Sequence, residues 1–330
     1  MPTSDSKNSS PPVVLQYENQ QVCVNNGESV LEALEREKIA IPYSCRAGVC
    51  HSCIMQGQGN IPPQSQQGLS PSQIAQHYFL ACCCYPEQDL TVSLRSSNTL
   101  ATVIVLEKNM LNNTVLRITL QVSFTWFAGQ FIHLWKNTTQ GRAYSIASRC
   151  DQNKTIELHI QRHEKGLISR WLQDEVHIGN AIPLSPPKGD CFYSDDHHNK
   201  PLVMAATGTG LAPLYGILQE AIAQQHSAPI YLYAASGEPS GLYYVEELRA
   251  LAKTYPLLHY YPVVKRQAHQ GMLAHDLSHI IKEHHRDLHG HKVFLCGSPV
   301  VVQSLQRQCF FQGANKQDIA IDAFETTTIE

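Results

Sequence analysis

Three cysteines stand close together in the stretch "YSCRAGVCHSC", at Cys45, Cys50 and Cys53. They are among eleven cysteines in 330 residues, a high and odd number. The amino-terminal "MPTSDSKNSSPP" lacks the basic and then apolar pattern of a secretory signal, so we expect a cytoplasmic protein whose thiols stay reduced. Cysteines grouped in this way in a reducing compartment indicate metal or redox chemistry before disulfides.

The spacing of these cysteines narrows the choice of metal. Structural zinc sites favour pairs of C-x2-C, whereas C-x4-C-x2-C with one distant cysteine is typical of the [2Fe-2S] cluster of plant-type ferredoxins. The stretch resembles that ferredoxin family, and "FLACCCYP" is similar to the family's "LAC" before its closing strand. The resemblance implies four cluster ligands, which are Cys45, Cys50, Cys53 and Cys82. Cys83 and Cys84 are then neighbours, and a zinc site or an unoccupied thiol cluster is the alternative.

The composition is that of a globular protein with more than one domain. A chain of 330 residues suits two or three domains of ordinary size. Hydrophobic residues make up 43% and charged residues 16%, and the net charge of -3 with scattered Lys and Arg argues against a nucleic-acid surface. The longest apolar runs fall far short of the roughly 20 residues that cross a bilayer. We therefore expect a protein or small-molecule partner, no nucleic acid and no membrane span.

The first third of the chain predicts a tail and a small domain. Residues 1–12 are rich in Ser, Asn and Pro and predict a disordered tail. Residues 13–97 contain a predicted hairpin in "VVLQY" and "QVCV", and a helix in "GESVLEALEREKIAIP" with Ser29 and Glu32 spaced as a capping box. The cysteine loop and the strand "LTVSLR" follow. The resemblance to ferredoxins implies an α+β β-grasp fold for this domain.

Two further domains are predicted after a short polar joint. Residues 100–195 consist of closely spaced β-rich runs with one helical segment, "GLISRWLQDEV", which indicates a barrel or a sandwich. The polar stretch "DCFYSDDHHNK" then separates this domain from residues 199–330. There, apolar strands such as "PLVMAAT" and "KVFLCG" alternate with helical stretches, which indicates a parallel sheet covered on both faces.

The motif "RAYSIAS" at the end of a predicted strand places an Arg, a Tyr and a Ser close together. It resembles the R-x-Y-S signature of the ferredoxin-NADP reductase superfamily, with "FAGQFIHL" upstream and "GLISRWL" downstream in the family's order. The resemblance implies an antiparallel FAD-binding barrel in which Arg142 binds the flavin phosphate, Tyr144 packs on the isoalloxazine and Ser145 lies near its reactive nitrogen. Gly166 and Ser169 would begin a helix whose free amides hold the pyrophosphate.

The stretch "MAATGTGLAP" is a strand, a glycine-rich turn and the start of a helix, which together favour phosphate binding at a helix terminus. It resembles the superfamily's nicotinamide-binding turn on a Rossmann-like α/β domain, and "VFLCGSP" is similar to its C-G-x-P element. The resemblance implies that Cys296 shapes hydride transfer without covalent attack, and that Phe324 lies near the flavin. The implied nucleotide-binding residues are Thr207, Gly208, Thr209, Gly210, Pro213, Cys296 and Gly297.

The choice of nicotinamide cofactor depends on cations near the ribose. After "YLYAAS" the chain offers Glu238 and no cation, which favours NADH. Lys265 and Arg266 in "VVKRQ" stand where NADP enzymes of the superfamily carry a Ser-Arg pair, so NADPH stays possible.

These motifs together predict an oxidoreductase that passes electrons from NADH through FAD and a [2Fe-2S] cluster to a partner protein. A hydride carries two electrons and the cluster accepts one at a time, so a flavin is needed between them. The order of the domains resembles the reductase components of bacterial multicomponent oxygenases, which implies a non-haem iron oxygenase as acceptor. The alternatives are a deoxysugar dehydrase as acceptor, or a redox-sensing interaction protein.

Three other features have a less specific interpretation. His51 stands where ferredoxins usually have a small residue. The histidine-rich segment 275–291 contains His275 and His279 at helical spacing, and we expect a solvated helix face there before a zinc site. The aromatic residues of the barrel domain are expected in its core, and these are Trp126, Phe127, Phe131 and Trp135.

Overall fold

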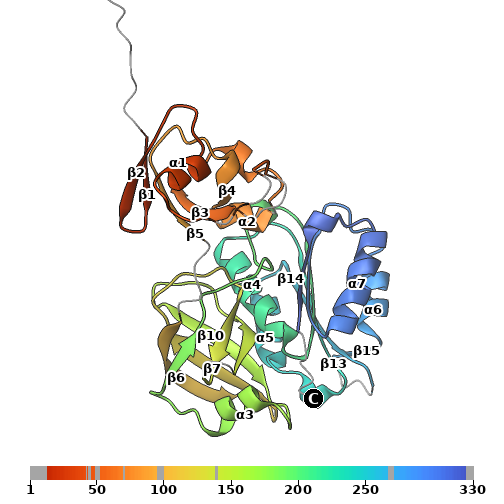
Figure 1. Cartoon of the computed structure of the whole chain (residues 1–330). Helices are drawn as coiled ribbons and strands as arrows, with labels where there is room; N and C mark the ends of the chain where they lie inside the picture. The colour runs from red at the N-terminus through yellow and green to blue at the C-terminus, as the bar shows by residue number, and fades with distance from the viewer. Residues whose placement is uncertain are drawn as a thin grey trace, which may run out of the picture. The chain divides into compact units, whose positions relative to one another are not determined.

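A computed structural model describes residues 13–41, 43, 46–48, 53–69, 71–94, 100–137, 140–266 and 271–324. The predicted tail and the predicted ligands Cys45 and Cys50 lie outside the described residues, as does His51. The chain divides into two compact units, residues 1–97 and 98–330 (Figure 1). Among the residues that the structure describes, no helix is both long and apolar enough to span a bilayer.

The first unit is a five-stranded mixed sheet with one helix packed on it (Figure 1). The strand order is β2-β1-β5-β3-β4, in which β1 and β5 are parallel and the other pairs are antiparallel. This is the predicted β-grasp fold. Its elements are β1 (Val13–Tyr17), β2 (Gln20–Val24), α1 (Val30–Arg36), β3 (Ile54–Gly59), η1 (Pro63–Gln66), α2 (Pro71–Ala75), β4 (Tyr78–Leu80), η2 (Ala81–Cys83) and β5 (Leu90–Leu94).

The second unit begins with a six-stranded antiparallel sheet in the order β10-β7-β6-β11-β8-β9. A bridge between Ile146, next to β9, and Leu158 of β10 joins the two edges, so the sheet closes into the predicted barrel. Its elements are β6 (Ala101–Met110), β7 (Val115–Gln121), β8 (Phe131–Trp135), β9 (Gly141–Ser145), β10 (Thr155–Gln161), α3 (Leu167–Asp174) and β11 (Ala181–Leu184).

A second six-stranded sheet, entirely parallel, completes this unit in the order β15-β14-β13-β12-β16-β17. The order reverses between β12 and β16, the place where open α/β sheets bind ligands. Its elements are η3 (Asp195–His197), β12 (Leu202–Thr207), η4 (Gly208–Gly210), α4 (Leu211–Ala223), β13 (Ile230–Ser236), η5 (Pro239–Gly241), α5 (Val245–Thr254), β14 (Leu258–Val264), β15 (Leu273–Ala274), α6 (Leu277–His284), β16 (Lys292–Gly297), α7 (Pro299–Phe311), η6 (Lys316–Asp318) and β17 (Ile319–Ala323).

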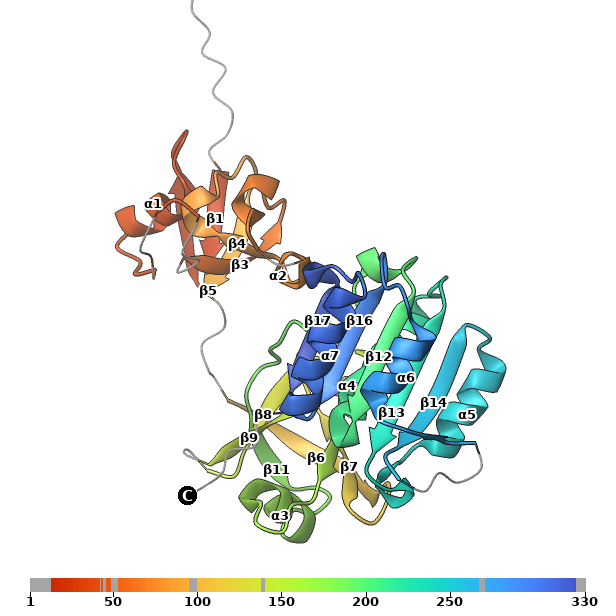
Figure 2. The same ribbon diagram turned by 90° about the vertical axis from the view of Figure 1, so that its right-hand side faces the viewer.

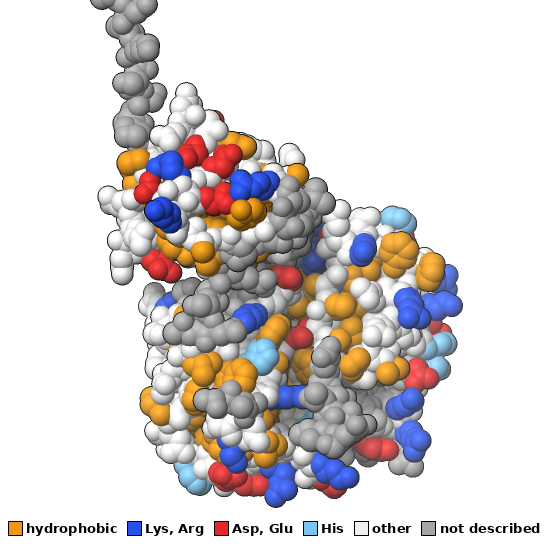
Figure 3. Space-filling model, in the orientation of Figure 1, with side chains coloured by type: hydrophobic (Ala, Val, Ile, Leu, Met, Phe, Trp, Pro, Cys, Tyr) orange, Lys and Arg blue, Asp and Glu red, His pale blue; other side chains and the backbone are white. Residues whose placement is uncertain are grey.

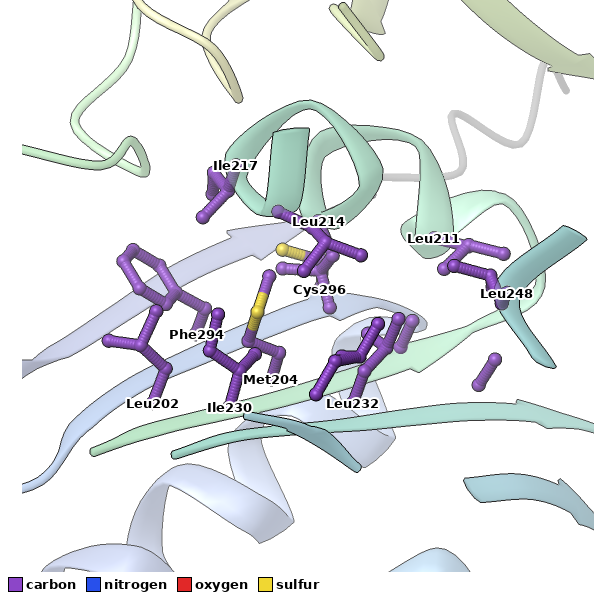
Figure 4. Packing of buried hydrophobic residues seen from close by; sticks show 14 of the residues in the cluster. Leu202, Met204, Leu211, Leu214, Ile217, Ile230, Leu232, Leu248, Phe294 and Cys296 are labelled. Carbon is purple, nitrogen blue, oxygen red and sulfur yellow. The ribbon is translucent and has the colours of Figure 1, made fainter. Parts of the chain in front are cut away.

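Helices cover both faces of the parallel sheet. One core lies between the strands and α4 with α5, on the side of the barrel, and a second lies between the strands and α6 with α7 (Figure 2). Figure 4 shows Leu214 and Ile217 of α4 above side chains from β12 and β16. Because apolar side chains are buried on both faces of the sheet, the sequences of these strands are continuous apolar runs.

Two expectations from the sequence need correction. Phe127 was expected in the barrel core but is 37% exposed, although its neighbour Trp126 is buried. The polar stretch Asp190–Lys200 is more than a joint between domains, because Cys191, Phe192 and Tyr193 within it are buried. The buried Tyr193 hydroxyl forms a 3.0 Å hydrogen bond with Nδ1 of His226. The composition of the stretch does not predict such a contact.

The solvated face expected at His275 and His279 is present, because both side chains are exposed, but one other histidine of the segment is buried. His275 precedes α6, and its ring stacks on that of His279 with centroids 3.7 Å apart. His279 contacts Glu283 at 3.0 Å on the exposed side of α6. His285, by contrast, is buried and its Nε2 lies 2.9 Å from the hydroxyl of Tyr233, so one histidine of the segment belongs to the core.

Charged side chains of both signs alternate over the described surface that Figure 3 presents. Around α1, for example, Arg36 pairs with Glu28 at 2.9 Å, and Arg46 pairs with Glu35 at 2.7 Å. Such exposed pairs contribute little to stability, about 0–1 kcal/mol each. The helix depends more on burial of its apolar face and on its amino-terminal cap.

The capping box predicted for α1 is present and gives a test of the first unit. The Ser29 Oγ accepts the backbone N–H of Glu32 at 3.3 Å, and the Glu32 carboxylate accepts the backbone N–H of Ser29 at 2.9 Å. We expect Ser29→Ala to lower the free energy of unfolding of this unit by about 1 kcal/mol. Urea unfolding followed by visible absorbance of the predicted cluster measures this loss. Ser93→Ala, at an exposed position of β5, is the control, and an equal loss there would contradict the assignment.

Candidate functional site

The sulfurs of Cys53 and Cys82 lie together, 3.3 Å apart and both buried. The antiparallel pairing of β3 with β4 causes this, because Ile54 and Leu80 are partners, so the residue before Ile54 and the residues after Leu80 lie at the same end of the two strands. The Ala81 N–H donates to the Cys53 carbonyl at 3.0 Å and fixes the turn that presents Cys82. The structure thus joins a cysteine of the loop to the distant cysteine.

This pair fits two ligands of one metal ion. Two thiolates on a tetrahedral metal, each at about 2.3 Å, lie about 3.8 Å apart. Burial raises the pKa of Cys53 to about 11, so this side chain stays a thiol at neutral pH until a metal displaces its proton. The described residues alone contain no group of three or more potential metal ligands, and the other two predicted ligands lie outside them.

The two cysteines after Cys82 have different environments. Cys84 is fully buried in the core, where burial raises its pKa to about 12, and its carbonyl accepts the backbone N–H of Val30 at the start of α1. The sulfur of Cys83 lies 3.7 Å from that of Cys82 and is partly exposed. Cys84 is therefore a core residue, and Cys82 remains our proposed fourth ligand.

Replacement of Cys82 tests the ligand assignment. We expect Cys82→Ser to abolish the visible and electron paramagnetic resonance signals of the cluster and electron transfer to one-electron protein acceptors, because a ligand is lost. Reduction of the flavin by NADH should survive, since it takes place in the second unit. Cys23→Ser, at an exposed position of β2, is the control. A cluster with unchanged signals in Cys82→Ser would rule out the assigned ligand.

In the barrel, β9 carries the three residues of the R-x-Y-S motif. Arg142 pairs with Leu134 and Tyr144 with Ile132 across the β8–β9 ladder, which places Arg142 and Tyr144 on one face. Tyr144 packs against the barrel core, and burial raises the pKa of its hydroxyl. Ser145, at the end of the strand, is buried and faces the parallel sheet.

The predicted pyrophosphate helix α3 begins directly after Gly166, which has no side chain to cap it. The Ser169 hydroxyl accepts the N–H of His163 at 3.3 Å and lies 3.4 Å from the Gly166 carbonyl, so it orders the loop before the helix. A Cβ on Gly166 would lie 2.4 Å from this hydroxyl, which explains the glycine. The uncapped amides of the first turn are compatible with a bound phosphate.

The glycine-rich turn lies at the reversal point of the parallel sheet. Thr207 ends β12, Gly208–Gly210 form a 3-10 turn, and α4 follows with Pro213 in its first turn. A Cβ on Gly210 would lie 2.3 Å from the Cys296 carbonyl oxygen, so only glycine permits this approach of α4 to β16. The Ser298 N–H donates to the Thr207 hydroxyl at 2.9 Å and joins the two loops.

A hydrogen bond joins the end of β9 in the barrel to β17 of the parallel sheet. The Ser145 hydroxyl donates to the Asp322 carboxylate at 2.6 Å, and Asp322 is the cross-strand partner of Cys296. One residue after β17, the Phe324 N–H donates to the Gly297 carbonyl at 2.8 Å. The structure therefore brings Ser145, Cys296, Gly297 and Phe324 together, and it adds Asp322, which the sequence analysis did not single out.

The chemistry of this junction depends on buried groups. Burial raises the pKa of Asp322, and the hydrogen bond from Ser145 partly opposes that shift. Cys296 is buried 3.8 Å from the sulfur of Cys191, and burial raises its pKa well above the ordinary value, so it is a thiol and a poor nucleophile. Ser145 and Asp322 can hold or move a proton, whereas the buried Cys296 thiol is not suited to covalent attack.

Comparison with known proteins agrees with this arrangement. Residues 13–87 match the 2Fe-2S iron-sulfur cluster binding domain, residues 102–193 the oxidoreductase FAD-binding domain, and residues 204–307 the oxidoreductase NAD-binding domain. The protein is an oxidoreductase that acts on NAD(P)H with FAD and a [2Fe-2S] cluster. It belongs to the family of three-domain reductases of the ferredoxin-NADP reductase type, which includes the reductase components of multicomponent oxygenases.

Individual relatives share the full layout. The reductase component of the naphthalene 1,2-dioxygenase system of Pseudomonas putida is 28% identical, over 94% of this chain and 98% of its own. The CDP-6-deoxy-L-threo-D-glycero-4-hexulose-3-dehydrase reductase of Yersinia pseudotuberculosis is 26% identical, over 90% and 93%. The crystal structure of an Amycolatopsis cytochrome P450 reductase aligns with a TM-score of 0.64 at 25% identity, over 94% of this chain and 98% of that chain.

The Ser145–Asp322 pair gives a test of the junction. We expect Asp322→Asn to slow reduction of the flavin by NADH roughly 10- to 100-fold, the scale of a group that assists proton transfer. Because burial raises the pKa of Asp322, the wild-type rate should fall on the acid side at a pH above that of an ordinary carboxyl group. This acid limb should be absent from Asp322→Asn. Stopped-flow absorbance across pH measures both, with Asp287→Asn, an exposed site, as the control.

Proposed function

We propose that this protein takes hydride from NADH and delivers the electrons singly to a partner non-haem iron oxygenase. The observation that carries the proposal is the junction of β9, β16 and β17, where the predicted flavin strand and nicotinamide strand meet within one unit. When bound, FAD accepts two electrons from the nicotinamide and releases them one at a time to the cluster. The residues of the protein would orient the flavin and the nicotinamide toward each other.

We assign the residues around the cofactors as follows. Arg142 would hold the flavin phosphate, Tyr144 would pack on the ring system, and Ser145 would lie near its reactive nitrogen. The uncapped start of α3 at Gly166 would hold the pyrophosphate, with Ser169 ordering its loop. The nicotinamide would lie between the η4 turn and Cys296, with Phe324 closing the flavin site. The order of these elements around the Ser145–Asp322 contact supports the assignment.

We infer that NADH is the preferred reductant. The ribose would lie at the carboxyl ends of β13 and β14, where the backbone carbonyl of Ser236 accepts the backbone N–H of Lys265 at 3.1 Å. The Lys265 ammonium lies 3.5 Å from the Asp276 carboxylate, which offsets its charge. With Glu238 also nearby in sequence, this edge carries carboxylates that disfavour a 2'-phosphate.

A change at Glu238 tests this preference. We expect kcat/KM for NADH to exceed that for NADPH about tenfold or more, because a like-charge contact costs several kcal/mol and about 1.4 kcal/mol corresponds to a factor of ten. Glu238→Gln should narrow the ratio by raising kcat/KM for NADPH, since a repelling carboxylate is removed. Initial rates with a dye acceptor measure it, and Glu87→Gln in the first unit is the control. A wild-type preference for NADPH would contradict the proposal.

The acceptor is proposed from the relatives. By its name, the naphthalene 1,2-dioxygenase reductase serves a dioxygenase, whereas the Amycolatopsis reductase serves a cytochrome P450. The deoxysugar dehydrase reductase has the same layout at 26% identity, so a dehydrase is the second candidate acceptor. We place the protein in the cytoplasm, since its many free cysteines and its cluster suit a reducing compartment.

Capture of the acceptor distinguishes these candidates. Tagged, NADH-reduced protein would be mixed anaerobically with an extract of the native host, crosslinked mildly, and analysed by mass spectrometry. Recovery of oxygenase subunits that the captured reductase then reduces would support the proposal, and recovery of a dehydrase would move the protein to the second candidate. Cys82→Ser protein, which should bind but not reduce the acceptor, is the control. Recovery of regulatory proteins alone would favour a sensor.

A further inference from the structure

We infer that Glu157 is a positioning residue for hydride transfer, because its backbone holds the flavin segment and its side chain holds the nucleotide-binding domain. This inference rests on the proposed function and adds a residue that none of the predicted motifs contains. Glu157 lies in β10 of the barrel and is not one of the two residues of the Ser145–Asp322 contact.

The backbone of Glu157 fixes the segment that follows β9. Its N–H donates to the Ser148 hydroxyl at 3.0 Å, and its carbonyl accepts the Ala147 N–H at 2.8 Å. Ser145, the residue of the junction, is only two positions before Ala147. Movement of Glu157 would therefore move the segment next to Ser145.

The helix α4 rests on the same segment. A Cβ on Gly216 would lie 3.0 Å from the Ile146 carbonyl oxygen, so α4 packs directly on this backbone. The Gln219 side-chain amide donates to the Ala147 carbonyl at 3.2 Å. Because α4 begins at the glycine-rich turn, the segment after β9 is the common support of the flavin strand and the nicotinamide helix.

The side chain of Glu157 extends to the nucleotide-binding domain. Its Oε1 accepts from Nε2 of His159 at 2.8 Å and from the Tyr244 hydroxyl at 3.1 Å. Burial lowers the pKa of His159, so its ring is neutral. Because Nε2 carries the proton, Nδ1 is the acceptor and takes the Tyr243 hydroxyl at 3.1 Å. The Arg117 Nε lies 3.6 Å from the other carboxylate oxygen.

The backbone of Tyr244 is in an unfavourable conformation, which these contacts stabilise. It has a φ of +57°, which is uncommon for a bulky side chain, and it stands at the start of α5. Its ring lies 4.8 Å from the ring of Tyr215 on α4, and its hydroxyl reaches Glu157. Strained positions that the surroundings hold in place are frequent at functional sites. Here the strained residue joins α4, α5 and the barrel.

Hydride transfer is sensitive to such a support. The reacting atoms must approach to about 3–3.5 Å, and a displacement of about 1 Å can cost a hundredfold in rate. We call Glu157, His159, Tyr243 and Tyr244 the Glu157 network. This network positions the nucleotide-binding domain on the barrel, and it does so next to the segment that follows Ser145. Its loss should misplace the nicotinamide while the Ser145–Asp322 pair remains intact.

The test compares two tyrosines that differ in position but not in chemistry. Tyr244→Phe removes the hydroxyl that binds Glu157. Tyr233→Phe removes a hydroxyl that lies 2.9 Å from both His284 and His285 on the opposite face of the sheet. Anaerobic stopped-flow absorbance would follow flavin reduction at saturating NADH and the long-wavelength charge-transfer band of the stacked nicotinamide and flavin. Thermal melting of each variant reports the loss of stability.

We expect Tyr244→Phe to slow flavin reduction about tenfold and to weaken the charge-transfer band. Tyr233→Phe should keep the wild-type rate and band despite a similar loss in melting temperature. Glu157→Gln, which keeps an acceptor oxygen, should retain more of the rate than Glu157→Leu. Should Tyr244→Phe fail to fold, Tyr243→Phe, which releases only His159, takes its place with the same expectation.

Two results would overturn the inference. The first is a wild-type rate and band in a folded Tyr244→Phe or Tyr243→Phe protein, and the second is an equal loss in Tyr233→Phe, which would show that only stability matters. Failure of the proposed function looks different, because wild-type flavin would then not be reduced by NADH at all, and this inference would fall with it.

Discussion

The hydrogen bond from Ser145 to Asp322 joins side chains 177 positions apart in the chain, and the functional site depends on it. A carboxylate in a buried position is costly unless it is hydrogen-bonded, so this contact favours the one arrangement in which β17 lies next to the end of β9. Since Asp322 is the cross-strand partner of Cys296, the same contact places the nicotinamide strand at the flavin strand. This one contact therefore contributes both to the position of the two strands and to the proton chemistry between them.

Close packing around this bond removes freedom between the barrel and the parallel sheet. Gly210 brings α4 against the backbone of β16 at a distance that a Cβ would prevent, and Gly216 packs α4 closely on the backbone of the segment after β9. The Glu157 network then ties the start of α5 to β10. Hydrophobic burial supplies most of the stability on both faces of the sheet, but it is not directional, so the polar contacts and the glycines define the geometry.

Much of the fold could be predicted from local pattern. Alternating or continuous apolar runs identified most strands of the barrel and the parallel sheet, and the capping box at Ser29 was read correctly from its spacing. The strand β17 was not identified, because "IAIDA" is short and half-buried and gives little periodicity. Phe127 was placed in the core because aromatic residues usually are, yet its position at a turn leaves it exposed. Burial at turns depends on neighbours distant in sequence.

The sequence by itself determined the cysteine spacing, the R-x-Y-S and glycine-rich motifs and the order of the three domains, because each is written in residues close together along the chain. Only the tertiary structure decided that Asp322 meets Ser145, that Cys84 belongs to the core, and that Glu157 joins two domains. These pairings arise when separate elements close on one another. A side chain's partner is then set by strand order and packing, which local patterns do not encode.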